Sequence, residues 1–238
     1  MIREAFRQAV IGTGVNDASI ALAQIKRQDI NLVSAFLPPA PETSAYLQNL
    51  DAENRFIKAG LGRDSGYGRD VAFFHYAGGR IEESDQNVLP RMEGYQSLLQ
   101  DINTRARLFS EATGFDKVSV MLRVLSATKD NLVWHRDNEM DMRGLQTLMG
   151  DMNTLWLPDQ HVNLHNFESG TDEDGNVWNG MKVSFDEVRQ YAQQIERHHM
   201  SIHKGELHAN PLYHSAPGYN EELGMKPGLR VLMTLDKA

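Results

Sequence analysis

Cysteine is absent from the 238 residues of this sequence. Disulfide bonds, thiolate metal sites and cysteine nucleophiles are therefore excluded for this chain. Because disulfides accumulate in oxidising compartments, a sequence without cysteine fits the reducing cytosol. We therefore expect a cytoplasmic protein.

Long apolar runs and an excess of positive charge are also absent. The longest apolar stretches are far shorter than the roughly 20 residues that a membrane-spanning helix needs. The N-terminal segment "MIREAFRQAVIGTGVNDASI" lacks the continuous apolar core of a signal peptide. With 24 basic and 32 acidic residues, the chain carries a net charge of −8 and lacks the positive footprint of a phosphate-backbone binder. We expect neither a membrane protein nor a nucleic-acid-binding protein.

The first half of the chain is rich in helix-forming residues. Residues 1–62 favour helices, and residues 86–113 carry apolar side chains at helical spacing up to Gly114. Between them, "DVAFFHYAGGR" at 70–80 has the pattern of a strand followed by a turn. The sequence therefore predicts a mainly helical portion over residues 1–115.

Short strand patterns dominate from residue 117 onwards. "KVSVMLRVLS" alternates apolar and polar residues, and further candidates include "LQTLM", "NTLWLP", "MSIHKG", "PLYHS" and "LRVLMTLD". One helix is expected among them at "SFDEVRQYAQQIERHH", where Ser184 and Glu187 form a capping box. Many short strands with turn-rich spacers predict an antiparallel barrel or jelly roll. We predict one α+β unit in which residues 1–115 pack on a β-core of residues 116–238.

The stretch "LVWHRDN" at 132–138 contains the most informative pair, His135 and Asp137. On a strand, residues two apart point to the same face. An imidazole and a carboxylate there supply two members of the 2-His-1-carboxylate set that binds Fe(II) in non-haem oxygenases. Taken alone, the pair is better explained as a polar strand end, because His-x-Asp is common by chance.

Two later segments supply the missing parts of such a site. "PLYHSAPG" offers His214 as a third ligand, and "GLRVLMTLD" offers Arg230 on the following strand. An arginine suits a carboxylate ligand because its planar fork pairs bidentately and stays charged. Thr234 shares a strand face with Arg230, so its hydroxyl could add a hydrogen bond to the same carboxylate.

This order of motifs resembles the Fe(II)/2-oxoglutarate-dependent dioxygenases. The resemblance implies a double-stranded β-helix core, which is related to the jelly roll and the cupins. It also implies that His135, Asp137 and His214 are the iron ligands and that Arg230 binds the 2-oxoglutarate carboxylate. Some nucleic-acid demethylases carry a second arginine near the end where this chain has Asp236. That difference argues against alkylated-base repair.

Residues 117–236 are also similar to an uncharacterised bacterial domain family. The shared pattern is His-x-Asp, an arginine, Thr-x-Trp-Leu-Pro, Lys-Gly, His-x-Ser-Pro and a final arginine-containing strand. Arg143 matches the first arginine, and it could either bind an anion in the pocket or lie on the surface. The chain departs from the pattern at Ser215-Ala216-Pro217, where Arg-Ser-Pro is expected.

Further histidines gather in "HHMSIHKGELH", and Trp134 is expected to pack below the metal and keep the site dry. A second, zinc-binding cluster is possible there, but a helix end, a strand and a turn explain these histidines as well. The candidate histidines are His198, His199, His203 and His208.

The sequence thus predicts an Fe(II)- and 2-oxoglutarate-dependent oxygenase acting on a small molecule or a protein side chain. The alternative is a non-redox, zinc-binding cupin-like protein or hydrolase. The sequence predicts no particular oligomeric state.

Overall fold

The computed structural model describes residues 11–12, 15–52, 63–64, 69–126, 134–150, 153–158, 161–162, 167–171, 177–181, 188–216 and 229–238. Its helices are α1 (Val15–Ala23), the short 3-10 helix η1 (Gln24–Lys26), α2 (Pro41–Ala52) and α4 (Tyr95–Thr113). Helix α4 ends at Gly114, whose φ of 86° places it in the left-handed region and lets its N–H bond the carbonyl of Ser110. None of these described helices combines the length and apolarity that a bilayer crossing requires.

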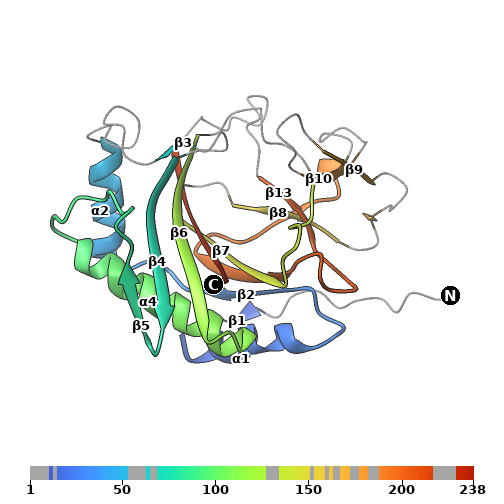
Figure 1. Cartoon of the computed structure of the whole chain (residues 1–238), viewed down its shortest axis with the longest axis horizontal. Coiled ribbons are helices and arrows are strands. Elements are labelled where there is room, and N and C mark those ends of the chain that lie inside the picture. Colours follow the sequence, from blue (N-terminus) through green and yellow to red (C-terminus); the bar gives the residue numbers. More distant parts are fainter. Residues whose placement is uncertain are drawn as a thin grey trace.

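A nine-stranded sheet forms the centre of the molecule (Figure 1), in the order β1-β2-β12-β7-β14-β6-β4-β3 with β5 paired to β4. All its pairs are antiparallel except β1 with β2. The strands are β1 (Ile11–Gly12), β2 (Leu32–Phe36), β3 (Arg63–Asp64), β4 (Arg69–Ala77), β5 (Arg80–Glu83), β6 (Lys117–Ser126), β7 (Met142–Met149), β12 (His199–Lys204) and β14 (Leu229–Lys237).

Two small antiparallel sheets complete the described strands. One has the order β11-β8-β13, from Gln193–Gln194, Leu155–Leu157 and Tyr213–Ser215; the other pairs β9 (Phe167–Thr171) with β10 (Val177–Met181). We call the three-stranded one the small sheet. The protein is therefore an α+β molecule built mostly on antiparallel sheet.

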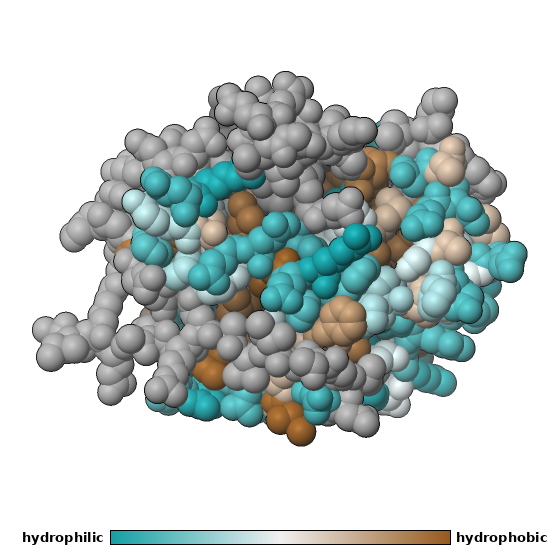
Figure 2. Space-filling model, turned by 180° about the vertical axis from the view of Figure 1, so that it is seen from behind, coloured by the Kyte–Doolittle hydropathy of each residue, from teal (hydrophilic) through white to brown (hydrophobic). Residues whose placement is uncertain are grey.

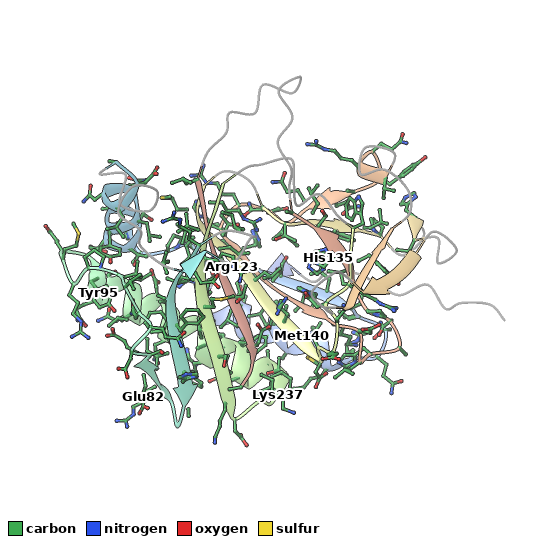
Figure 3. All side chains as sticks on the ribbon, turned by 45° about the horizontal axis from the view of Figure 1, so that its top comes forward. Glu82, Tyr95, Arg123, His135, Met140 and Lys237 are labelled. Atoms are coloured by element: carbon green, nitrogen blue, oxygen red, sulfur yellow. The ribbon has the colours of Figure 1, made fainter. Side chains whose placement is uncertain are left out.

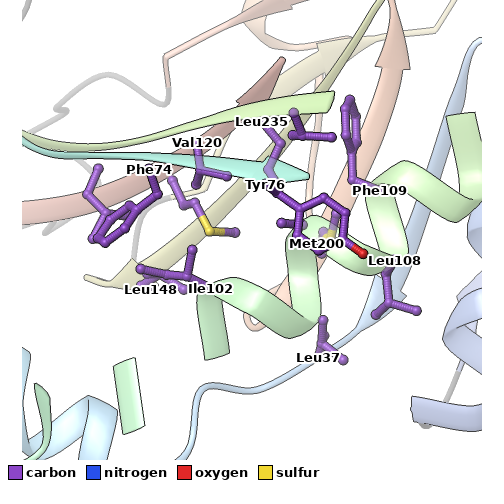
Figure 4. Close-up of a cluster of buried hydrophobic side chains, with 14 of the residues drawn as sticks. Leu37, Phe74, Tyr76, Ile102, Leu108, Phe109, Val120, Leu148, Met200 and Leu235 are labelled. Atoms are coloured by element: carbon purple, nitrogen blue, oxygen red, sulfur yellow. The ribbon is translucent and has the colours of Figure 1, made fainter. Parts of the chain in front are cut away.

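The helices cover one face of the large sheet and bury the main core against it (Figures 1 and 4). Strand alternation explains which side chains take part. On β14, Val231, Met233 and Leu235 are fully buried in this core, and Phe109 and Ile102 of α4 pack against the same layer. We call this the helix face.

The opposite face of the large sheet, which we call the site face, carries the alternate residues. It has a layer of polar side chains, including His203 and Arg230, next to apolar ones such as Leu32 and Leu145. The small sheet packs against it, since Trp156 of β8 and Leu212 form a buried cluster with Leu32 of β2. The outer surface seen from behind is mostly hydrophilic with separate apolar patches (Figure 2). The two sheets therefore enclose the polar layer between them.

Two expectations from the sequence need correction. The first 115 residues are not only helical: the strand predicted at 70–80 is confirmed as β4, but β2 was not expected, and the two pair with β6 and β12 in the large sheet. The segment "LVSAF" of β2 is buried on both faces, and such strands lack the alternation that marks a half-buried strand.

The second expectation that needs correction is the helix over residues 184–199. Its capping-box residues Ser184 and Glu187 lie outside the described residues. In the described part, 188–199, Val188 and Arg189 are helical, but the chain then turns and forms β11, whose residues pair with Trp156 and Leu155 of β8. Tertiary strand pairing overrides the helix propensity of this polar segment.

Candidate metal centre

A two-residue backbone bridge brings His135 and His214 together. Their main chains form an isolated antiparallel pair in which each N–H donates to the other's carbonyl at 2.9 Å. The two imidazole rings consequently lie 4.4 Å apart between their centroids. Figure 3 shows His135 on the side of the large sheet away from Tyr95 of α4.

Asp137 completes a cluster of three potential metal ligands. One ligand atom from each of His135, Asp137 and His214 lies within 4.8 Å of the others. Asp137 and His214 are buried, and His135 is partly exposed. The structure thus brings together the three residues that the sequence predicted as ligands, although they come from segments nearly eighty residues apart.

Both oxygens of the Asp137 carboxylate have protein partners. Arg143 donates from Nη1 to Oδ1 at 2.6 Å, and His203 Nε2 lies 2.7 Å from Oδ2. Arg143 also donates from Nε and Nη2 to the two carboxylate oxygens of Asp236, at 2.7 and 3.1 Å. The Arg143 guanidinium therefore lies between two carboxylates.

The charge states at the centre suit metal binding. Burial alone would raise the pKa of Asp137, but His214, Arg143 and His203 together hold it well below its usual value. Burial lowers the pKa of the His214 imidazole well below its ordinary value. A carboxylate and a neutral imidazole are the protonation states in which these groups bind metals.

Arg230 is buried on the site face without a carboxylate partner among the described residues. It donates from Nε to the hydroxyl of Thr147 at 2.9 Å and from Nη2 to the hydroxyl of Thr154 at 2.8 Å. Burial lowers its pKa to about 10. A buried guanidinium that contacts only neutral hydroxyls favours an anionic ligand, because burying an unpaired charge is costly.

Several buried polar atoms near these residues also lack a hydrogen-bond partner among the described residues. They include Thr234 Oγ1, His214 Nδ1 and Ser215 Oγ. Thr234 lies four residues after Arg230 on β14, so both side chains emerge on the site face. Unpartnered buried polar atoms are rare in folded proteins and mark places where a ligand or water binds.

The metal cluster and Arg230 are close along the small sheet. His214 pairs with Trp156 across β13 and β8, and Thr154, the partner of Arg230, precedes Trp156 by two residues. At about 3.3 Å per residue, Thr154 lies about 7 Å along the chain from Trp156, the residue that pairs with His214.

The other candidate histidines do not gather into a second metal cluster within the described ranges. His208 bonds Asp141, and His199 Nδ1 lies 3.2 Å from the carbonyl of Arg197. His203 is the exception, since it joins the first centre through Asp137. Sequence reasoning placed it in a separate histidine group because cross-strand pairing of β12 with β7 could not be read from the sequence.

Trp134, the residue before His135, is buried in an apolar cluster with Leu155, Leu157, Val188 and Tyr213. Tyr213 directly precedes His214, so two members of this cluster are chain neighbours of candidate ligands.

Comparison with protein families gives one match. A model of the DUF1826 family, described as a protein of unknown function, matches residues 16–236. The chain belongs to this family. The match includes α1 and α2, which the sequence resemblance over residues 117–236 left out. A search of the curated proteins finds no match.

Solved structures similar to this chain include several dioxygenases. The dioxygenase for auxin oxidation of Arabidopsis thaliana, in complex with 2-oxoglutarate, has a TM-score of 0.49 and 9% identity over 96% of this chain and 92% of that chain. The corresponding rice enzyme has a TM-score of 0.48 and 11% identity, and the match covers 97% of this chain and 82% of that chain. The Fe(II)/α-ketoglutarate-dependent dioxygenase TqaL has a TM-score of 0.48 and 12% identity, and the match covers 93% of this chain and 88% of that chain. Values this low assign no residue role or activity to this chain.

Proposed function

We propose that this protein is an Fe(II)- and 2-oxoglutarate-dependent oxygenase with a double-stranded β-helix core. The observation that carries the proposal is that the site face holds both the cluster of His135, Asp137 and His214 and the buried cation Arg230, which has no carboxylate partner among the described residues. The ligand set matches that of non-haem Fe(II) oxygenases, and three protein ligands leave metal positions open.

The residues present fit both a metal ion and a dicarboxylate. Two imidazoles and one carboxylate converge within 4.8 Å. Arg230 lacks a carboxylate partner among the described residues, and Thr234 Oγ1 is buried without a hydrogen-bond partner there. Thr154, which bonds Arg230, precedes by two residues the partner of His214 in the small sheet, and this proximity suits a ligand with an acid group at each end.

In this proposal each residue has a defined task. His135, Asp137 and His214 hold the metal, which when bound supplies the oxygen-activating redox chemistry. Arg230 pairs with the far carboxylate of 2-oxoglutarate, and the Thr234 hydroxyl donates to the same group. An anion at Arg230 offsets the burial that lowers the pKa of this guanidinium. The apolar cluster around Trp134 excludes water from one side of the metal ligands.

The substrate proposed is a small molecule or a protein side chain, and the compartment proposed is the cytoplasm. The net charge of −8 weighs against nucleic acid as the substrate.

Anaerobic addition of Fe(II) and then 2-oxoglutarate tests the proposal. We expect a weak visible charge-transfer band, and slow succinate release once oxygen is admitted. Arg107 on α4 bonds only Glu111 on the protein surface, so Arg107→Lys is a matched control for Arg230→Lys. The band should survive in the control and require far more 2-oxoglutarate in Arg230→Lys. Tight Zn²⁺ binding with no band and no oxygen consumption would instead support the non-redox zinc protein.

A further inference from the structure

Two side chains of the large sheet, His203 and Arg143, contact the Asp137 carboxylate, and a third, Asp236, contacts Arg143. His203 of β12 lies directly opposite Arg143 of β7, and Arg143 lies directly opposite Asp236 of β14. Alternation places all three side chains on the site face, in one row beneath Asp137. The row is polar at every position, which contrasts with the fully apolar residues on the helix face of β14.

Backbone contacts fix this row relative to the loop that carries Asp137. The N–H of Glu206 donates to the carbonyl of Asp137 at 2.9 Å, and the N–H of Gly205 donates to the carbonyl of Asp141 at 2.8 Å. A side chain at Gly205 would meet the carbonyl oxygen of Met140 at 2.5 Å. Glycine after Lys204 therefore lets the end of β12 approach the Asp137 loop closely, and this explains the Lys-Gly in the sequence pattern.

The two bonds to Asp137 act on different oxygens. Oδ2 lies 3.8 Å from His214 Nε2 and is therefore the oxygen that faces the other ligands. His203 contacts the same Oδ2 at 2.7 Å, whereas Arg143 contacts Oδ1 at 2.6 Å. Each carboxylate oxygen has two lone pairs, so Oδ2 can bind a metal while it still accepts from His203, whereas the Arg143 bond ties Oδ1 to the guanidinium on the side of Asp236.

We propose that His203 and Arg143 are positioning residues that hold Asp137 as a one-oxygen metal ligand. His203 orients Oδ2 toward the metal, and Arg143 keeps Oδ1 away from it. Asp236 fixes the Arg143 guanidinium from the far side through two hydrogen bonds. The result is an open metal position for the keto-acid end of 2-oxoglutarate. This inference rests on the proposed function for that last step, while the metal-binding step stands without it.

The sequence left two interpretations of Arg143, an anion-binding residue in the pocket or a surface arginine. In the structure, Arg143 donates three hydrogen bonds to Asp137 and Asp236, and its pKa is raised above the ordinary value because these two carboxylates outweigh the effect of burial. A guanidinium neutralised in this way is a poor anion site. Arg230, which has no such partner among the described residues, fits that role better.

Metal affinity tests the role of His203. Titration of the apo-protein with Co²⁺ should show affinity falling 10- to 100-fold in His203→Leu, the range measured for residues that orient metal ligands. His203→Gln keeps a donor at a similar reach and should stay within about threefold of the parent. His208 forms a comparable His–Asp bond with Asp141 outside the ligand cluster, so His208→Leu is the matched control and should bind Co²⁺ normally. Equal Co²⁺ affinity of the parent protein and His203→Leu would overturn the positioning role of His203.

Coordination number tests the role of Arg143. In Arg143→Lys a single ammonium replaces the fork, and Oδ1 is free to reach the metal. The visible absorption of bound Co²⁺ weakens as coordination number rises, so the variant should give a weaker spectrum than the parent. It should also need at least tenfold more 2-oxoglutarate for the same spectral change, at near-normal Co²⁺ affinity.

Asp236→Asn is a second variant that releases Arg143 more gently and should shift the spectrum in the same direction. Parent-like spectra in both folded variants overturn the proposal. If no protein, including the parent, responds to 2-oxoglutarate, the proposed function fails while the Co²⁺ affinities still decide the role of His203.

Discussion

Two buried arginines, Arg105 and Arg230, lie on opposite faces of the large sheet and differ in what surrounds them. On the helix face, Arg105 bonds the carboxylate and carbonyl of Asp101, the side chain of Gln146 and the carbonyl of Leu37. On the site face, Arg230 bonds two threonine hydroxyls. Burial lowers the pKa of both, but only Arg105 has a carboxylate that opposes this effect. A satisfied buried charge supports the fold, whereas an unsatisfied one indicates a place for a ligand.

The largest effect should come from the satisfied arginine. Arg105→Met leaves Asp101, Gln146 and the Leu37 carbonyl without the hydrogen bonds that Arg105 donates to them. We therefore expect the free energy of unfolding to fall by about 3–5 kcal/mol. Urea denaturation measures it. Arg107→Met, on the exposed side of the same helix, should change stability by less than about 1 kcal/mol. A small effect of Arg105→Met would remove the contrast between the two arginines.

Removing a metal ligand should abolish binding without comparable damage to the fold. His214→Ala deletes one of three ligands, so Fe²⁺ or Co²⁺ affinity should fall by more than about 100-fold, beyond the loss typical of residues that only orient ligands. Calorimetric titration of the apo-protein gives the value. Unchanged affinity would show that the metal binds elsewhere.

The unsatisfied arginine should behave in the opposite way to Arg105. Arg230→Met removes a buried charge that has no carboxylate partner among the described residues, so stability should stay within about 1 kcal/mol of the parent or increase. Affinity for 2-oxoglutarate should fall about 100-fold, the cost of losing a charged hydrogen-bonding partner. Strong destabilisation together with unchanged 2-oxoglutarate affinity would make Arg230 a structural residue like Arg105.

His214 should give the site face a pH dependence in the metal-free protein. Burial holds its pKa well below 6.5, so the folded chain does not take up the proton that the unfolded chain binds below about pH 6.5. Stability should therefore fall as pH drops below 6.5, by about 1.4 kcal/mol per pH unit from this group. His214→Asn should lose that component in denaturation curves between pH 7 and 5, and parallel profiles of the two proteins would contradict the assignment.

Thr234 should give the smallest effect. Its buried hydroxyl has no partner among the described residues, so Thr234→Val should leave stability unchanged or slightly higher. If the hydroxyl donates to 2-oxoglutarate, affinity should fall about fivefold, equivalent to one hydrogen bond of about 1 kcal/mol. Equal affinity in parent and variant would remove Thr234 from the ligand site.

Some of this arrangement was readable from the sequence because it depends on local pattern. His135 and Asp137 are two residues apart, and Arg230 and Thr234 lie on one strand with the right alternation. Strand β6 and the end of helix α4 followed from apolar periodicity and Gly114, whereas the helix begins at Tyr95 and not at residue 86 as predicted. Each of these features is decided by neighbours within about a dozen residues.

Other features depend on pairing between distant strands and could not be read in this way. His203 meets Asp137 only because β12 pairs with β7, and Thr147 and Thr154 meet Arg230 only because the two sheets pack together. The strand β2 has no alternation because both its faces are covered. Long-range packing also ends the helix expected over residues 184–199 after Arg189 and places β11 in the part that follows.

The central claim is that the metal cluster and Arg230 form one site. It is tested most directly by measuring 2-oxoglutarate affinity calorimetrically with and without bound Zn²⁺, which binds the same ligand types but has no redox chemistry. One shared site predicts at least tenfold tighter 2-oxoglutarate binding with the metal present, and no such gain in His214→Ala. Equal affinity with and without metal in the parent protein would contradict the account.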